Sequence, residues 1–163
     1  FYPTDELAEI LRRSAQILGV PLKDDADMEI AARSRGTPRI ANRLLKRVRD
    51  YAEVKGDGVI TIETVNASLK MEGIDDVGLD KFDRKYLKAL IEFYNGGPVG
   101  VEALAATLNE EQDTLADMVE PFLLKIGFVI RTASGRRATS RSFQHLGYSY
   151  KAKAAEEEMP SLF

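Results

Sequence analysis

The sequence predicts a mainly α protein in which a bundle of four short helices precedes a winged helix-turn-helix domain with a short β-hairpin wing. Three observations support this prediction. Apolar residues recur at helical spacing in successive segments of the first half. A stretch with two glycines and three acids interrupts that pattern over residues 73–80. Beyond it, three further helical segments precede two short extended runs, which is the order of elements in a winged helix.

The first part of the chain is expected to form four amphipathic helices. The first begins with Thr4 as a capping residue and ends at Gly19. The second covers about residues 25–35 and stops at Gly36, and the third begins at Pro38, which suits the first helical position. Their inward residues are the apolar ones at helical spacing: Leu7, Ile10, Leu11, Leu18, Ile30, Ala31, Ile40, Ala41, Leu44, Leu45 and Val48.

A break at residues 56–58 ends the third helix, and a short extended run over residues 59–62 leads to a fourth, which ends near Gly73. Since the four helices are short and each is amphipathic, they are expected to pack as a small bundle. We place this first domain at residues 1–75.

The second domain is expected over residues 76–150. Its three helices are predicted over residues 80–94, 101–108 and 111–126, with an Asn-Gly-Gly-Pro turn at residues 95–98. The hairpin follows, with strands over residues 127–132 and 138–143 and a basic turn over residues 133–137. The remaining residues, 151–163, are predicted to be a disordered tail.

Composition narrows the possible classes of protein. The chain has no cysteine and one histidine, which excludes disulfides, thiolate metal sites and a metal site of several histidines within it. No apolar stretch approaches the length of a membrane span, and the first residues do not resemble a signal peptide. These features predict a cytoplasmic protein.

The charge distribution points to phosphate at two places. The net charge of −3 argues against a globally basic nucleic-acid binder. Yet residues 30–49 and residues 125–153 each carry seven Lys or Arg and no acid. Such local patches can bind phosphates in a salt-dependent way. A solvated basic face explains each patch equally well.

The start of the third helix is a specific candidate for phosphate binding. With Thr37 as the cap and Pro38 in the first position, Arg39 lies in the first turn, beside unpaired backbone N–H groups. A cation there opposes the helix dipole, whereas a bound phosphate would interact favourably with both. The alternative is an ordinary surface arginine next to a good capping sequence.

The segment from Ala32 to Asp50 closely resembles the lid segment of the RuvB family, AAA+ motors of bacterial Holliday-junction branch migration. The likeness runs from Phe1 to about Tyr148 and includes shorter matching motifs: Asp83-Arg84, Gly96-Gly97-Pro98-Val99-Gly100, Glu120-Pro121, Arg131-Thr132 and Gly135-Arg136. The resemblance implies that the first domain is an AAA+ lid, and that the chain belongs to an ATP-dependent DNA helicase of recombination and repair.

The resemblance also implies nucleotide contacts. Arg39 matches the sensor-2 arginine, which reaches the γ-phosphate, and Tyr2 matches a residue that lines the nucleotide site near the base. Tyr2 can also be read as a hydrophobic residue that is merely exposed. The chain contains no Walker A or Walker B motif. ATP with Mg²⁺ is therefore expected to bind mainly to a large ATPase domain outside this chain, and the chain alone is expected to be inactive.

In the second domain, Arg131 and Arg136 match the DNA-contacting arginines of the family, with Arg136 expected at the tip of the wing. The family usually reads Arg-Thr-Pro-Arg-Gly-Arg here, whereas residues 131–136 read Arg-Thr-Ala-Ser-Gly-Arg, and Gln112 stands where some relatives carry arginine. The third helix of this domain begins with several acids, Glu110, Glu111 and Asp113, and carries Asp117 and Glu120 further on. These would repel phosphate, which favours backbone contact by the wing over base reading by the helix.

The partners implied by the resemblance are duplex DNA at Holliday junctions, the large ATPase domain, neighbouring subunits of a hexameric ring, and RuvA, which would contact the large domain. Two other classes remain open. A non-motor winged-helix regulator or initiator would show sequence preference. A pure interaction module would show no salt-dependent affinity for DNA at all.

Overall fold

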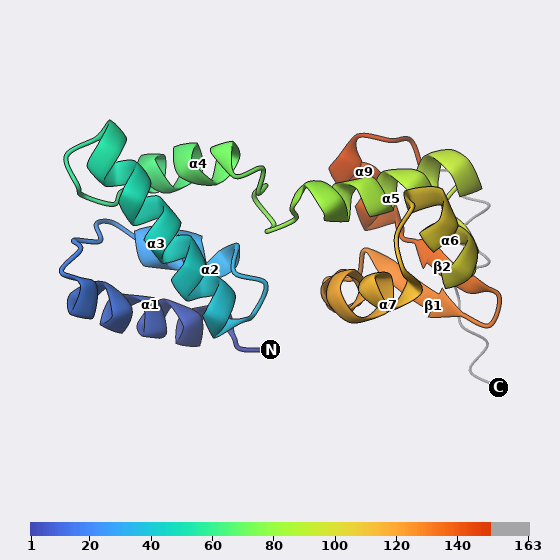
Figure 1. Ribbon diagram of the computed structural model, residues 1–163, viewed down its shortest axis with the longest axis horizontal. Helices are drawn as coiled ribbons and strands as arrows, with labels where there is room; N and C mark the ends of the chain where they lie inside the picture. Colours follow the sequence, from blue (N-terminus) through green and yellow to red (C-terminus); the bar gives the residue numbers. More distant parts are fainter. Residues whose placement is uncertain (151–163) are drawn as a thin grey trace. The chain divides into compact units, whose positions relative to one another are not determined.

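A computed structural model describes residues 1–150, and the tail predicted over residues 151–163 lies outside the described residues (Figure 1). The chain forms two compact units, Phe1–Lys81 and Phe82–Phe163. The described part is mainly helical with one two-stranded hairpin, which confirms the predicted fold class. Within residues 1–150, each helix is too short or too polar to cross a membrane.

The first unit contains the four expected helices: α1 (Thr4–Leu18), α2 (Ala26–Ala32), α3 (Pro38–Lys55) and α4 (Ile62–Met71). Two of the expected caps differ in detail. Thr4 is the first helical residue and follows Pro3 at the cap position, while Thr37 occupies the cap position of α3 without a side-chain capping bond. The extended run before α4 is reduced to a single parallel bridge between Leu22 and Ile60.

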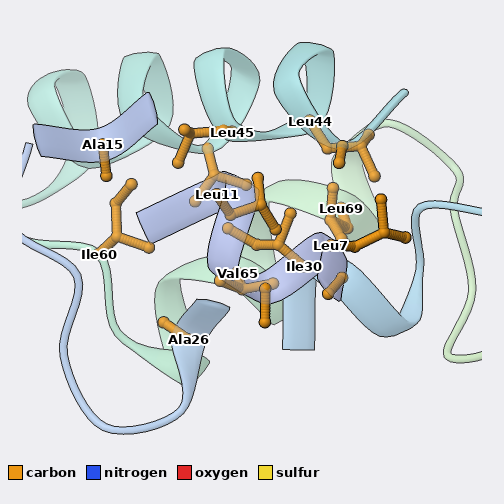
Figure 2. Close-up of a cluster of buried hydrophobic side chains, with 14 of the residues drawn as sticks. Leu7, Leu11, Ala15, Ala26, Ile30, Leu44, Leu45, Ile60, Val65 and Leu69 are labelled. Carbon is orange, nitrogen blue, oxygen red and sulfur yellow. The ribbon is translucent and has the colours of Figure 1, made fainter. Parts of the chain in front are cut away.

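The four helices enclose one apolar core, which Figure 2 shows in close-up. Leu7 and Leu11 of α1 point into it, as do Leu44 and Leu45 of α3. Most of the residues expected to face inward are buried, whereas Ile10, Leu18 and Ile40 lie partly exposed at its margin. The spacing of apolar residues therefore identified the correct face of each helix.

A buried arginine ties α2 to α4 inside this unit. Arg33, only 7% exposed, follows the last residue of α2. Its guanidinium donates to Glu29 at 2.7 Å and also to the amide oxygen of Asn66 in α4. A buried guanidinium needs partners for its charge, and these two partners connect the end of α2 to α4. The predicted continuation of α2 to residue 35 is wrong.

The second unit is built from more numerous, shorter elements: α5 (Lys81–Tyr94), α6 (Val101–Leu108), α7 (Gln112–Thr114), the π-helical segment η1 (Leu115–Val119), α8 (Glu120–Lys125), β1 (Val129–Thr132), β2 (Gly135–Ala138) and α9 (Ser140–Leu146). The first two helices agree closely with the prediction. The single regular helix predicted over residues 111–126 is instead α7, η1 and α8 in succession.

The π-helical segment has a covalent cause. Pro121 lies in the first turn of α8 and has no N–H to donate to the carbonyl of Asp117, four residues before it. A wider turn directly before a proline accommodates its ring, and π-bulges of this kind are frequent at functional sites. Glu120, between η1 and Pro121, is fully buried.

The second strand of the hairpin is shorter and earlier than predicted. β2 covers Gly135–Ala138, and residues 140–146 form α9 instead of continuing the strand. The hydroxyl of Thr139 donates to the carbonyl of Gly127 at 2.5 Å, and that of Ser142 donates to Phe128 at 2.7 Å. These bonds and the buried Phe143 turn the chain back onto the domain, so residues 140–146 form a helix and the predicted strand over residues 138–143 is wrong.

The core can be tested with two substitutions in α1. Leu11→Ala removes a fully buried side chain and is expected to lower the free energy of unfolding by about 2–5 kcal/mol. Ile17→Ala, at a position that is 80% exposed, is the matched control and should change it by less than about 1 kcal/mol. Chemical denaturation of both variants measures the difference, and similar losses would contradict the packing described here.

Candidate functional site

The first candidate site is the corner where the N-terminal segment meets the start of α3. The backbone N–H of Tyr2 donates to the carbonyl of Gly36 at 2.8 Å. Gly36 precedes the first turn of α3 by two residues, and Arg39 lies in that turn. Both side chains are exposed, Tyr2 by 48%. The structure therefore brings the two residues predicted to contact nucleotide to one accessible corner of the first unit.

The loop before α3 has an unusual backbone. Arg35 and Gly36 both adopt the left-handed conformation, with φ of 58° and 71°. A bulky side chain rarely adopts this conformation unless surrounding contacts hold it there. One such contact comes from the guanidinium of Arg35, which donates to the carbonyl of Gly78. The reversal between α2 and α3 is thus held by the segment that follows α4.

The basic run over residues 30–49 does not form one surface. Arg33 is buried against Glu29, and Arg35 is only partly exposed. The exposed cations that remain all belong to α3 and follow its helical spacing: Arg39, Arg43, Lys46 and Arg47. A phosphate approaching the start of α3 would therefore meet Arg39 first, since it alone of these lies in the first turn.

The second candidate site is the wing. β1 and β2 form a hairpin in the second unit (Figure 1). They pair antiparallel, with Arg131 opposite Arg136 and Thr132 opposite Gly135. On its other side, β2 pairs with the turn before α6, because Arg136 and Val99 exchange backbone hydrogen bonds of 2.7 and 3.0 Å. β2 thus lies between β1 and this turn, and the backbone of Arg136 is hydrogen-bonded to Val99.

The register corrects the predicted position of Arg136. The two residues between the strands, Ala133 and Ser134, form the exposed tip, whereas Arg136 lies within β2. The prediction placed the tip at residues 133–137 because the second strand was expected to begin at Ala138. Gly135 already pairs with Thr132, so the turn closes three residues earlier.

Both wing arginines contact one buried carboxylate. Glu120 of α8 is fully buried, and it accepts from Nε of Arg136 at 3.0 and 3.1 Å on its two oxygens. It also accepts from the guanidinium of Arg131 at 3.3 Å. The side chain of Arg136 is 18% exposed and that of Arg131 is 50% exposed. One negative charge thus faces two positive charges, and the cluster carries a net positive charge at the surface of the wing.

Comparisons with known proteins cover both units. Residues 2–75 match the sequence family of the RuvB AAA lid domain, and residues 76–147 match that of the RuvB C-terminal winged helix domain. The chain carries the lid and winged-helix domains of the RuvB family. The two matches meet within the glycine-containing segment that the sequence marked as the domain boundary.

Similar proteins agree with this family. The RuvB subunit of the Holliday junction branch migration complex from Desulfosudis oleivorans is 53% identical over 151 residues, covering 93% of this chain and 44% of that protein. The solved Thermotoga maritima RuvB Holliday junction branch migration motor has a TM-score of 0.90 at 50% identity, covering 93% of this chain and 51% of that one. The solved structure of a proline-to-glycine mutant of the Thermotoga protein has a TM-score of 0.90 at 49% identity, covering 93% of this chain and 50% of that one. The chain spans about half the length of these RuvB proteins.

The residue that the sequence did not single out as functional is Glu120. It was counted among the acids of the third helix of the RuvB winged-helix domain, as a group that would repel phosphate. Its burial removes it from that surface. The signal that could have found it is the Glu-Pro pair, since a proline inside an expected helix marks an irregular turn.

A buried phenol lies beside the same carboxylate. Burial raises the pKa of Tyr86 above its ordinary value of 10, and the negative charge of Glu120 raises it further. Tyr86 of α5 is therefore a neutral phenol at physiological pH, and the charges of the cluster are those of the carboxylate and the two arginines.

The acidic start of the third helix in the winged-helix domain is exposed as predicted. An open cleft between α6 and α7 is lined by small and acidic residues: Glu102, Ala105, Ala106, Glu110, Glu111, Gln112 and Asp113. This surface would repel a nucleic-acid backbone. In this RuvB-family chain the exposed positive charge of the second unit lies on the hairpin, whereas the start of the helix that reads bases in other winged helices is acidic.

The close docking of the wing makes a prediction at Gly135. This residue has φ of 130°, and a Cβ there would lie 2.3 Å from the carbonyl oxygen of Val99. Gly135→Ala is expected to lower the free energy of unfolding of the second unit by more than about 2 kcal/mol. Chemical denaturation and the amide resonances of the hairpin would measure this loss.

Gly100→Ala is the matched control for Gly135→Ala. Gly100 has φ of −69°, and a Cβ there meets nothing within 4 Å. Its substitution should cost less than about 1 kcal/mol. Equal destabilisation by the two substitutions would contradict the docking of β2 against Val99.

Proposed function

We propose that this chain is the C-terminal part of an ATP-dependent DNA translocase that drives Holliday junction branch migration in recombination and repair. The lid, residues 1–75, would sense nucleotide, and the winged-helix domain, residues 76–150, would grip the DNA backbone. The proposal is supported by the identity to proteins named as RuvB branch migration subunits and motors. The observation that carries it within this chain is the half-exposed Arg131 on a wing with net positive charge.

The nucleotide is ATP with Mg²⁺, held mainly by a large ATPase domain. The chain has no Gly-x-x-x-x-Gly-Lys-Ser/Thr sequence to cradle phosphates. Arg39 would donate to the γ-phosphate of nucleotide bound by that domain, and Tyr2 would pack near the base. A planar guanidinium distinguishes ATP from ADP because hydrolysis removes its acceptor. Loss of that contact would let the lid rotate and so couple hydrolysis to movement.

DNA is contacted through phosphates. Arg131 and Arg136 lie on one face of a hairpin, and guanidinium groups bind phosphate oxygens without reading base edges. A translocating motor requires this kind of contact, since it must move over every sequence. The acidic cleft between α6 and α7 disfavours a regulator that reads bases through its third helix.

The assembly follows from the same family. The partners would be duplex DNA at Holliday junctions, neighbouring subunits of a hexameric ring, and RuvA, which would bind the large domain and not this chain. The working compartment would be the cytoplasm.

Binding to random-sequence duplex DNA across a salt series tests the DNA-binding half. We expect weak binding at physiological salt, with Kd on the order of 10–100 μM, that strengthens steeply as salt is lowered. Arg131→Ala combined with Arg136→Ala should abolish most of it and reduce the slope of log K against log salt by up to about 2. Lys85→Ala with Lys88→Ala, at exposed positions of α5, removes the same charge as a control.

Three outcomes of that experiment would contradict the proposal. A clear preference for one DNA sequence would indicate a non-motor winged-helix regulator. Failure to bind at any salt concentration would indicate that the basic residues form a solvated face. An unchanged affinity in the arginine variant would remove the wing from the interface.

The nucleotide-sensing half is tested at Arg39. This chain alone should turn over no ATP. Joined to its ATPase domain, the protein with Arg39→Ala should show kcat for ATP hydrolysis lowered on the order of 100-fold, because a charged donor to the transferred phosphate is lost. Arg13→Ala, at an exposed position of α1, is the matched control. Equal activities of the two variants would exclude Arg39 from the nucleotide site.

A further inference from the structure

The two wing arginines are not equivalent in their contacts with Glu120. Arg136 donates from Nε to both carboxylate oxygens at nearly equal distances of 3.0 and 3.1 Å. Arg131 makes one longer contact of 3.3 Å. The side chain of Arg131 is 50% exposed, against 18% for Arg136. The carboxylate is therefore bound mainly by Arg136 and contacted from the surface by Arg131.

The backbone places the two residues differently as well. Arg136 lies in β2, between β1 and Val99, and a Cβ at Gly97 would lie 2.3 Å from its carbonyl oxygen. Arg131 lies in β1, whose only sheet partner among residues 1–150 is β2. Arg136 is thus enclosed on two sides, whereas Arg131 lies on an outer strand with one side open.

The third observation concerns the charges of Arg131, Arg136 and Glu120. Directly opposite residues of an antiparallel pair have side chains close together, and like charges at such positions repel. Glu120 offsets this repulsion. Because the carboxylate is fully buried, it must always keep at least one cationic partner. Two cations around one anion leave one of them free to exchange partners.

We propose that Glu120 is a positioning residue that gives the two arginines different tasks: it fixes Arg136 within the fold and holds Arg131 at the surface, where a DNA phosphate replaces it as partner. This inference rests on the proposed binding of DNA by the wing. Arg136 stays paired with the carboxylate during the exchange. Arg131 can therefore leave Glu120 without leaving a buried charge unpaired. Arg131 then contacts the nucleic acid by exchanging partners, whereas Arg136 contributes to the contact without leaving Glu120.

Two double variants with the same net charge test the assignment. Glu120→Gln/Arg136→Gln and Glu120→Gln/Arg131→Gln each remove one negative and one positive charge, so both keep the net charge of the original cluster. They differ only in which arginine remains. Each is compared with the unmodified chain for affinity to random-sequence duplex DNA over a salt series, and for its thermal unfolding midpoint.

We expect the variant that retains Arg131 to bind DNA within about threefold of the unmodified chain, with the same salt slope. The variant that retains Arg136 should bind on the order of tenfold more weakly, with a slope smaller by about 1. Equal affinities of the two variants, or tighter binding by the one that retains Arg136, would overturn the assignment.

Stability provides a readout that does not depend on DNA. Arg136→Gln alone leaves the buried carboxylate with only its longer contact, and its unfolding midpoint should fall by roughly 10 °C. Adding Glu120→Gln should restore most of that loss. A single variant as stable as the unmodified chain, or a double variant as unstable as the single one, would show that Arg136 does not serve as the fixed partner.

Spectra of the unmodified chain test the exchange if a variant fails to fold. On titration with duplex DNA, the Nε–Hε resonance of Arg131 should shift and that of Arg136 should stay in place. Equal shifts would overturn the inference. If the unmodified chain binds no DNA at low salt, the proposed function fails and the exchange at Arg131 fails with it. If it binds but the resonance of Arg131 does not move, only the present inference fails.

Discussion

The wing of this molecule depends on one buried carboxylate. The hairpin register sets Arg131 directly opposite Arg136, an arrangement that repels unless an anion lies between them. Glu120 supplies that anion from α8, and Pro121 and the π-helical turn before it interrupt the helix at this point. A buried ion pair contributes little net stability, but removing one partner costs about 3–5 kcal/mol. The cluster therefore constrains geometry more than it stabilises the fold.

The first unit relies on a comparable arrangement around a different arginine. Arg33 is buried between Glu29 and Asn66, and the loop after it passes through two left-handed residues before α3 begins. A Cβ at Gly78 would lie 3.0 Å from the carbonyl oxygen of Arg33, so the segment after α4 packs closely on this loop. The same loop carries the carbonyl that holds Tyr2. The loop before α3 thus contacts both the N-terminal segment, through Tyr2, and the segment after α4, through Gly78.

Each unit has one exposed arginine that we propose to contact phosphate, and in each a second, more buried arginine supports the fold. In the first unit the exposed residue is Arg39 and the buried one is Arg33. In the second unit the exposed residue is Arg131 and the enclosed one is Arg136. Guanidinium suits both tasks, because it keeps its charge when buried and offers several donors in a plane. Counting cations along the sequence could not separate the two uses.

The sequence by itself determined the helices of the first unit, the faces they bury, the order of elements in the second unit and the likeness to the RuvB family. These follow from local signals, namely apolar spacing, prolines and glycines at helix ends, and short motifs. The sequence did not determine the register of the hairpin. The run from Ala138 to Phe143 was predicted to be a strand, yet Thr139 and Ser142 bond to the carbonyls before β1 and Phe143 is buried, so α9 begins at Ser140. The sequence also did not predict the burial of Glu120, because the pattern of residues around a glutamate in a polar helix is the same whether its side chain faces solvent or two arginines. Only the tertiary structure decided these points, because the start of α9 and the burial of Glu120 depend on contacts between residues eleven or more positions apart, and such contacts leave no period in the sequence.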